Sequence, residues 1–145
     1  MLERASGSLH MRLGVLCDHA MIGQDGKLSL IGIFDHIGVV QLPAQHPRFY
    51  VVCVLQGEAR NPYVEMELNA PNGQTLMHEQ IGINPDMIAQ GSGNLIAEVT
   101  MLPLEMTGRF EFRIIGDGQV LGLIPLSVDA VEPNPAGAPQ AMPRA

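Results

Sequence analysis

The sequence lacks several features that identify common functional classes. Its 145 residues include no tryptophan, two tyrosines and four phenylalanines, too few aromatic rings for the stacking surfaces that bind single-stranded nucleic acid or carbohydrate. Basic residues are also scarce: eight Lys and Arg stand against 15 Asp and Glu, for a formal charge of −7. A chain with this charge repels a phosphate backbone, so the sequence indicates no nucleic acid binding.

Long apolar segments are missing as well. No window approaches the roughly 18 consecutive apolar residues of a membrane-spanning helix, and the first ten residues, MLERASGSLH, lack the apolar centre of a secretory signal. We therefore expect no membrane insertion and a cytoplasmic location. The two cysteines, Cys17 and Cys53, lie inside apolar runs, which favours buried free thiols over a disulfide framework.

Motifs for common cofactors and nucleophiles are absent too. The chain contains no G-x-x-x-x-G-K-[ST] phosphate loop, no G-x-G-x-x-G, no G-x-S-x-G and no C-x-x-C. We therefore identify no catalytic residue and expect no cofactor, and we favour a protein without enzymatic activity.

What the chain does contain is the alternation typical of β-strands. Apolar and polar residues alternate in 64–69 and 109–114, as in strands with one buried and one wet face. The runs RLGVL (12–16), LSLIGIF (28–34) and VVCVL (51–55) are apolar on both faces. This pattern is typical of central strands, or of strands covered by a partner.

Turn residues separate these segments at the spacing of a β-sandwich. Asp25-Gly26, Asn72-Gly73 and Gly116-Asp117-Gly118 tolerate positive φ, and we expect each to close a hairpin. The sequence thus predicts an all-β fold, an antiparallel β-sandwich of about eight strands. Asn84 followed by Pro85 predicts one short helical turn near 85–90. The predicted strands lie near 11–18, 27–35, 48–56, 63–69, 74–81, 93–101, 108–115 and 119–128.

Composition divides the chain into three parts. Residues 1–10 mix charged and small polar residues, and we expect a flexible N-terminal leader. Residues 11–130 have the length of a single β-sandwich domain. Residues 131–145, rich in Pro and Ala, are expected to form a disordered tail.

Two Asp-His pairs are the candidate metal or acid–base residues: Asp18 with His19, and Asp35 with His36. In a hairpin with a two-residue turn, His19 would lie opposite Gly32, and His36 would follow about four residues further along, roughly 13 Å away. Metal ligands must lie within about 2 to 2.5 Å of one point. The spacing therefore disfavours a single site built from both pairs.

The favoured interpretation is that Asp18 and Asp35 end their strands by hydrogen bonding to nearby backbone. A smaller site that combines one pair with a distant histidine, such as His46 or His78, stays open.

Several motifs resemble a family of short bacterial proteins of uncharacterised function. They are Leu16-Cys17-Asp18, the block GKLSLIGIFD (26–35), PRFYVV (47–52), GRFEF (108–112) and IPLSV (124–128). The resemblance spans roughly residues 11–128 and implies a small β-sandwich with no assigned activity, so no catalytic residue is carried over. Within the block, we expect Gly32 to relieve crowding where another backbone passes.

These observations favour a non-enzymatic protein-binding or assembly module, with a protein partner or a second copy of the chain as its ligand. An accessory or structural subunit of a larger particle is one form of this hypothesis. The alternatives are a metal-dependent hydrolase or a small-ligand-binding protein that uses the Asp18-His19 or Asp35-His36 region.

Overall fold

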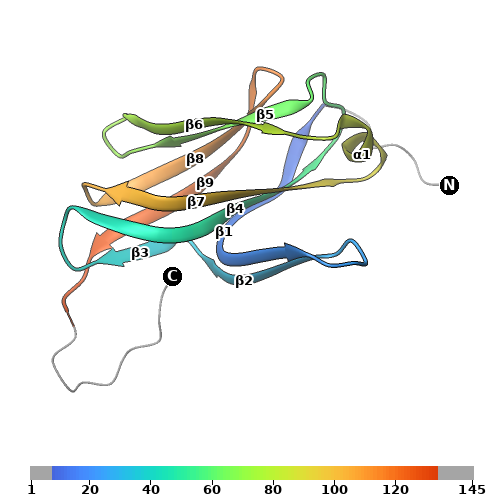
Figure 1. The fold of residues 1–145 in the computed structure, drawn as a ribbon. Helices are drawn as coiled ribbons and strands as arrows, with labels where there is room; N and C mark the ends of the chain where they lie inside the picture. Colours follow the sequence, from blue (N-terminus) through green and yellow to red (C-terminus); the bar gives the residue numbers. More distant parts are fainter. Residues whose placement is uncertain (1–7, 134–145) are drawn as a thin grey trace.

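The fold is a two-layered β-sandwich, seen in a computed structural model that describes residues 8–133 (Figure 1). Its elements are β1 (His10–Ile22), β2 (Leu28–Phe34), β3 (His36–Val39), β4 (Ala44–Gln56), β5 (Tyr63–Asn69), β6 (Thr75–Gly82), α1 (Pro85–Gln90), β7 (Gly93–Leu104), β8 (Gly108–Gly116) and β9 (Gln119–Ala130). Within this part of the chain, no helix has the length and apolar character needed to cross a membrane.

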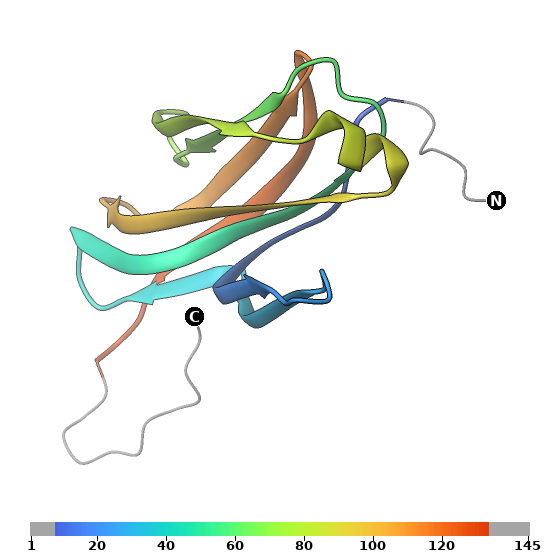
Figure 2. The same ribbon diagram turned by 45° about the vertical axis from the view of Figure 1, so that its right-hand side comes forward.

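The strands form two sheets that pack face to face (Figures 1 and 2). The four-stranded sheet has the order β2-β1-β4-β7, and the five-stranded sheet has the order β3-β9-β8-β5-β6. The predicted all-β sandwich is therefore confirmed. One detail was wrong: β3 was not predicted, and it pairs parallel with β9, so the five-stranded sheet is mixed rather than purely antiparallel.

The three predicted hairpins are confirmed, since β1 pairs with β2, β5 with β6 and β8 with β9. The first turn is longer than two residues: the Gly23 N–H donates to the Lys27 carbonyl oxygen at 2.9 Å. This longer turn shifts the register, so that His19 lies opposite Ile31 rather than Gly32.

The core lies between the sheets and is built from alternate residues of each strand. Phe49 of the four-stranded sheet and Phe112 of the five-stranded sheet are fully buried, and their rings meet edge to face with centroids 6.0 Å apart. Burying a side chain of this size stabilises the fold by about 1.5–3 kcal/mol. Among the described residues, no polar or charged residue is buried, so the two layers are held together by apolar packing.

Five connections pass between the two sheets, and two of them are held by notable hydrogen bonds. After β2 the chain crosses into the five-stranded sheet at Asp35, whose carbonyl oxygen accepts the Ser127 N–H at 2.8 Å. At the other side α1 links β6 to β7. The Asn84 side chain accepts the N–H groups of Asp86 and Met87 at 3.1 and 3.3 Å, which caps the helix. The predicted helical turn near 85–90 is confirmed.

Most of the expected flexible leader and disordered tail lies outside the described residues, in 1–7 and 134–145. Within the described part, Leu9 is 5% exposed and belongs to the core. At the other end, the Val131 N–H donates to the Val39 carbonyl oxygen at 2.8 Å. The packed domain therefore extends slightly beyond the expected boundaries at 11 and 130.

Candidate functional site

The first Asp-His pair lies within β1 rather than at its end, since the strand continues to Ile22. The interpretation of Asp18 as a strand terminator was therefore wrong. Its carboxylate lies over Gly32 of β2, where an added Cβ would collide with it. This corrects the expected reason for Gly32: the group that needs the space is a side chain, not another backbone. The His19 ring meets the ring of Tyr50 edge to face at 6.1 Å.

The second pair lies at the crossing between the sheets. Asp35 follows β2, and His36 opens β3. The imidazole of His36 contacts the carboxylate of Asp129 on β9, because the parallel pairing of β3 with β9 brings these strands together. The structure thus places His36 in the five-stranded sheet and His19 in the four-stranded sheet, each with a partner from outside the two pairs.

Two other histidines were considered as distant ligands. His78 lies 3.5 Å from the Glu65 carboxylate. His46 packs against Phe34 and Phe49, with ring centroids 5.9 and 5.4 Å apart. Burial lowers the pKa of His46, and the charge of Asp18 partly offsets that effect. Between residues 8 and 133, no three His, Cys, Asp or Glu side chains gather closely enough to hold a metal ion.

The two thiols, Cys17 and Cys53, are fully buried and not linked to each other. Burial raises the pKa of Cys17, and it raises the pKa of Cys53 to about 12. Both groups therefore stay protonated near neutral pH, and a protonated, buried thiol is a poor nucleophile.

The most unusual surface is the outer side of the four-stranded sheet, which we call the apolar face. The strand register aligns its side chains in rows: Val15 lies opposite Val52, which lies opposite Ile96. Ile31 and Ile33 are each 60% exposed, and Leu13 is 40% exposed. The residues of the apolar face are Leu13, Val15, Cys17, Ile31, Ile33, Val52, Val54 and Ile96.

Charged and polar groups border the apolar face at one end. The Tyr50 hydroxyl donates to the Glu98 carboxylate at 3.1 Å, and Arg48 lies 3.7 Å from the same carboxylate. An apolar centre with a polar border is the usual anatomy of a protein interface.

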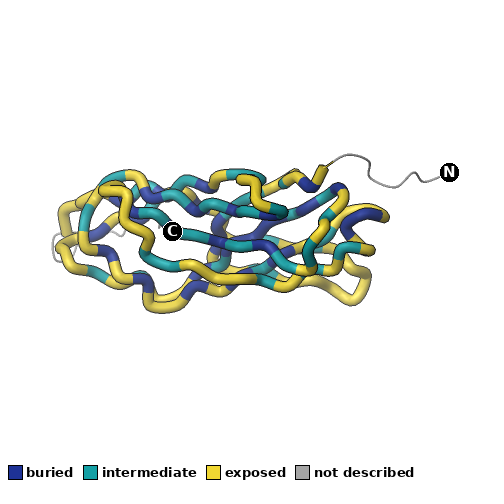
Figure 3. The backbone as a smooth tube through the Cα atoms, turned by 90° about the horizontal axis from the view of Figure 1, so that it is seen from above, coloured by how far each residue is buried: buried dark blue, intermediate teal, exposed yellow. Residues whose placement is uncertain are grey.

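The outer side of the five-stranded sheet is different. It carries acidic and basic side chains, among them Glu67 opposite Arg113 and Glu111 opposite Pro125. Buried residues alternate with half-buried ones along β5, β8 and much of β9, as expected for strands with one face in the core and one facing solvent (Figure 3). The two outer faces therefore differ in chemistry: the five-stranded sheet mixes charged side chains with Leu123, whereas the apolar face has rows of neutral side chains.

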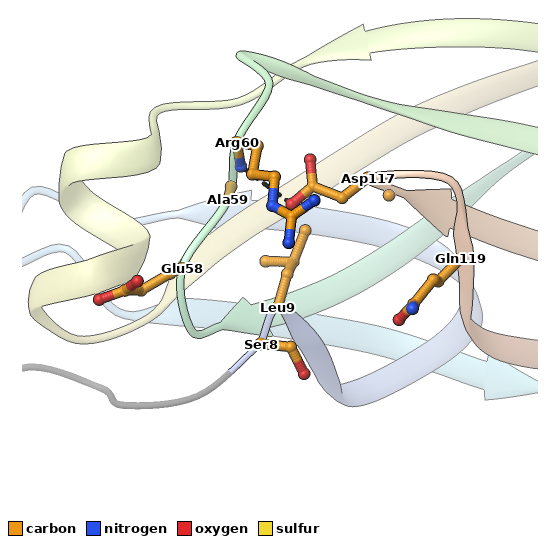
Figure 4. A pocket seen from close by; sticks show the side chains of 8 residues that line it. Ser8, Leu9, Glu58, Ala59, Arg60, Asp117 and Gln119 are labelled. Carbon is orange, nitrogen blue, oxygen red and sulfur yellow. Dashed lines mark hydrogen bonds between the residues drawn. The ribbon is translucent and has the colours of Figure 1, made fainter.

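A pocket of about 350 Å³ lies among the start of β1, the β4–β5 connection and the β8–β9 turn. In Figure 4 Arg60 and Asp117 lie next to each other, whereas the side chains of Ser8, Glu58 and Gln119 lie apart around the rim. The Asp117 carboxylate accepts hydrogen bonds from the Arg60 N–H, the Asn61 N–H and the Asn61 side chain at 2.9, 3.2 and 3.1 Å. This carboxylate therefore ties two loops together.

These features define a two-sheet β-sandwich with one apolar and one charged outer face. The chain belongs to DUF6941, a family of unknown function, which matches residues 12–129. That range is close to the 11–128 covered by the resemblance noted in the sequence, and it agrees with that resemblance in pointing to a family without an assigned function. No curated protein matches the chain.

Two solved structures are similar in outline. An immunoglobulin-like protein from Pseudomonas aeruginosa is 10% identical, with a TM-score of 0.46 over 86% of this chain and 98% of that one. The alkylpurine DNA glycosylase AlkC from Pseudomonas fluorescens, bound to DNA containing an abasic site analog, is 15% identical, with a TM-score of 0.41. It is matched over 86% of this chain and 31% of that one.

Proposed function

We propose that the protein is a non-enzymatic binding or assembly module that docks a protein partner onto the apolar face. The observation that carries the proposal is the exposure of Ile31 and Ile33, 60% each, beside the apolar rows of β1, β4 and β7. A contiguous apolar patch on an outer sheet face is typical of interaction sites.

The physical reason is the free energy of removing this surface from water. Burial of apolar surface contributes about 25 cal/mol per Å², so covering the exposed parts of Leu13, Ile31 and Ile33 favours association. The polar border formed by Arg48 and Glu98 gives the contact a fixed orientation, because charged groups at a rim contribute more to register than to affinity.

The chemistry of the chain supports a protein as the partner. Its formal charge of −7 opposes nucleic acid, and the centre of the apolar face carries no charged side chain. Two free, unlinked thiols support a cytoplasmic location, because thiols persist in reducing compartments. The metal-dependent hydrolase has less support, since each histidine of the two Asp-His pairs has a partner from outside the pairs.

The test compares Leu13→Lys with Leu123→Lys. Leu13 lies on the apolar face and is 40% exposed, whereas Leu123 is 47% exposed on β9 of the other sheet, which makes the second variant a matched control. Each tagged protein is isolated from the source organism and its native mass is measured.

A partner protein at fixed stoichiometry should be present with the wild type and with Leu123→Lys, and absent with Leu13→Lys. Equal melting temperatures would show that all three proteins are folded. A partner retained by Leu13→Lys, or no partner with any of the three, overturns the proposal.

A further inference from the structure

The sandwich has four edge strands, β2 and β7 in one sheet and β3 and β6 in the other. An edge strand presents unpaired backbone N–H and C=O groups, and proteins protect such edges by shortness, charge, proline or irregular backbone. The four edges differ in the charge and proline that they carry, and therefore in how open they are to another strand.

Three of the edges are protected. β3 has four residues. β6 carries Glu79 in its middle. β7 carries Glu98 and Pro103, and its backbone is irregular at Met101, where φ is 51°.

β2 has none of the protecting side chains. Its seven residues, LSLIGIF, include no charge and no proline. Gly32 has φ of 71°, and the β1–β2 ladder keeps one register but omits the pair of Asp18 with Gly32. The β4–β7 ladder omits Met101 in the same way, so backbone irregularity does not distinguish these two edges, and charge and proline do. β2 is therefore a neutral, apolar edge strand that pairs on one side only.

We propose that β2 pairs antiparallel with β2 of a second copy about a twofold axis, joining two four-stranded sheets into one of eight strands. This inference rests on the proposed function, because the joined sheets place two apolar faces side by side as one binding surface. At ~4.8 Å between strands, the combined face would be roughly 34 Å wide.

We assign a second copy as the occupant because β2 is neutral along its whole length and can face its own copy without charge repulsion. Each chain carries a formal charge of −7, so most contacts between copies bring acidic groups together. Pairing β6 with itself would bring Glu79 of the two copies close, and pairing β7 with itself would do the same for Glu98. Like charges directly opposite each other destabilise a sheet. In β2 the facing side chains would be neutral, chiefly Ile31 and Ile33.

The size of the contact sets its strength. A strand of seven residues offers an edge of about 23 Å, and a contact made mainly along one edge falls in the small class of interfaces that are weak or transient, below about 1,200 Å². The dimer should therefore form with rising protein concentration rather than permanently.

The first test is sedimentation of the purified full chain from low to high micromolar concentration. The wild type should shift from monomer to dimer mass, and Ile31→Lys should abolish the shift, because a lysine on the edge opposes pairing. Leu123→Lys is the control with the same change in side chain. If Ile31→Lys is unfolded by circular dichroism, Ser29→Lys at an exposed position of β2 replaces it.

Leu13→Lys separates this inference from the proposed function. Leu13 lies on β1, inside the apolar face, so its variant should lose the partner protein and still form the dimer. A dimer abolished by Leu13→Lys, whatever Ile31→Lys does, would mean that the apolar faces stack, and it would overturn edge pairing. A wild type that remains monomeric at all concentrations also overturns it.

Cross-linking provides an independent readout. The native thiols are buried, so new cysteines at Ser29, Ile31 and Ile33 report on the edge without background. These positions share one side of β2. In every twofold antiparallel register centred between residues 29 and 33, at least one of these positions faces itself or another of the set. Mild oxidation of the single variants and of their mixtures should therefore give disulfide-linked dimers in at least one combination. Dimers from Val54→Cys alone, on the apolar face, contradict the proposal.

Discussion

Replacing Gly32 by alanine should lower the free energy of unfolding by about 1.5–3.5 kcal/mol. The backbone of Gly32 has φ of 71°, a left-handed conformation that costs an L residue about 1–2 kcal/mol. The new Cβ would also lie 2.9 Å from Cγ and 3.0 Å from Cβ of Asp18. Asp18 must then leave its rotamer, which costs about 0.5–1.5 kcal/mol.

The assay is urea denaturation followed by far-UV circular dichroism, together with a thermal scan. At about 2–4 °C per kcal/mol for a chain of this size, the melting temperature should fall by roughly 3–14 °C. In an Asp18→Ala background the collision with the carboxyl group disappears and only the contact with Cβ at position 18 remains, so Gly32→Ala should cost less than it does in the wild type.

Gly82→Ala is the control, because Gly82 has no positive φ and the nearest atom to its added Cβ is 4.0 Å away. It should change stability by less than about 0.5 kcal/mol. If Gly32→Ala costs no more than this control, the reasoning about φ and about Asp18 is refuted.

Three further changes test other parts of the fold. Burial lowers the pKa of His46, so the folded state resists its protonation and stability falls as the pH drops below about 6.5. Denaturation at about pH 7.5 and pH 5.5 should show a smaller loss for His46→Phe than for the wild type, and equal losses would contradict this. Asp117→Ala removes an acceptor of three hydrogen bonds and should cost about 1–3 kcal/mol in urea denaturation, whereas Asp117→Asn, which keeps one acceptor oxygen, should cost less. A coloured thiol reagent should label neither Cys17 nor Cys53 in the folded protein, and both in denaturant, because both are fully buried; rapid labelling of the native protein would show that one of them is accessible.

Much of the fold could be predicted from local sequence. β5 matches its predicted range, 63–69, because Val64, Met66 and Leu68 alternate with acidic residues along one buried side. The hairpin turns at Asn72-Gly73 and Asp117-Gly118 were also predictable, because these residue types tolerate positive φ. The observed φ is 88° for Gly73, 51° for Asp117 and 77° for Gly118. Both signals depend on residues that are neighbours in the chain.

Features that depend on distant partners could not be predicted. β3 is four residues long, and its pairing partner, β9, is distant in the sequence because it is the last strand of the fold. The contact between His36 and Asp129 could not be predicted for the same reason. It depends on the pairing of β3 with β9, and no local sequence pattern indicates that pairing.

The apolar face was predictable only in part. Runs apolar on both sides indicated central strands or strands covered by a partner, and β1 and β4 are indeed central. LSLIGIF has the same pattern, yet β2 is an edge strand. A strand that is apolar on both sides suits an edge position only if another molecule covers it. Both proposals start from this property of β2.

The difference between the two outer faces limits how an assembly could grow. A sandwich with an apolar outer face on both sheets could bind further copies through both faces. Such copies could add indefinitely, because each bound copy would present another unoccupied apolar face. Here the far side carries charged side chains such as Glu67, Glu111 and Arg113, which remain hydrated when the apolar face is covered. A complex built on the apolar face alone would therefore be capped by the other face, and it would close as a dimer or a one-to-one complex rather than grow into a filament.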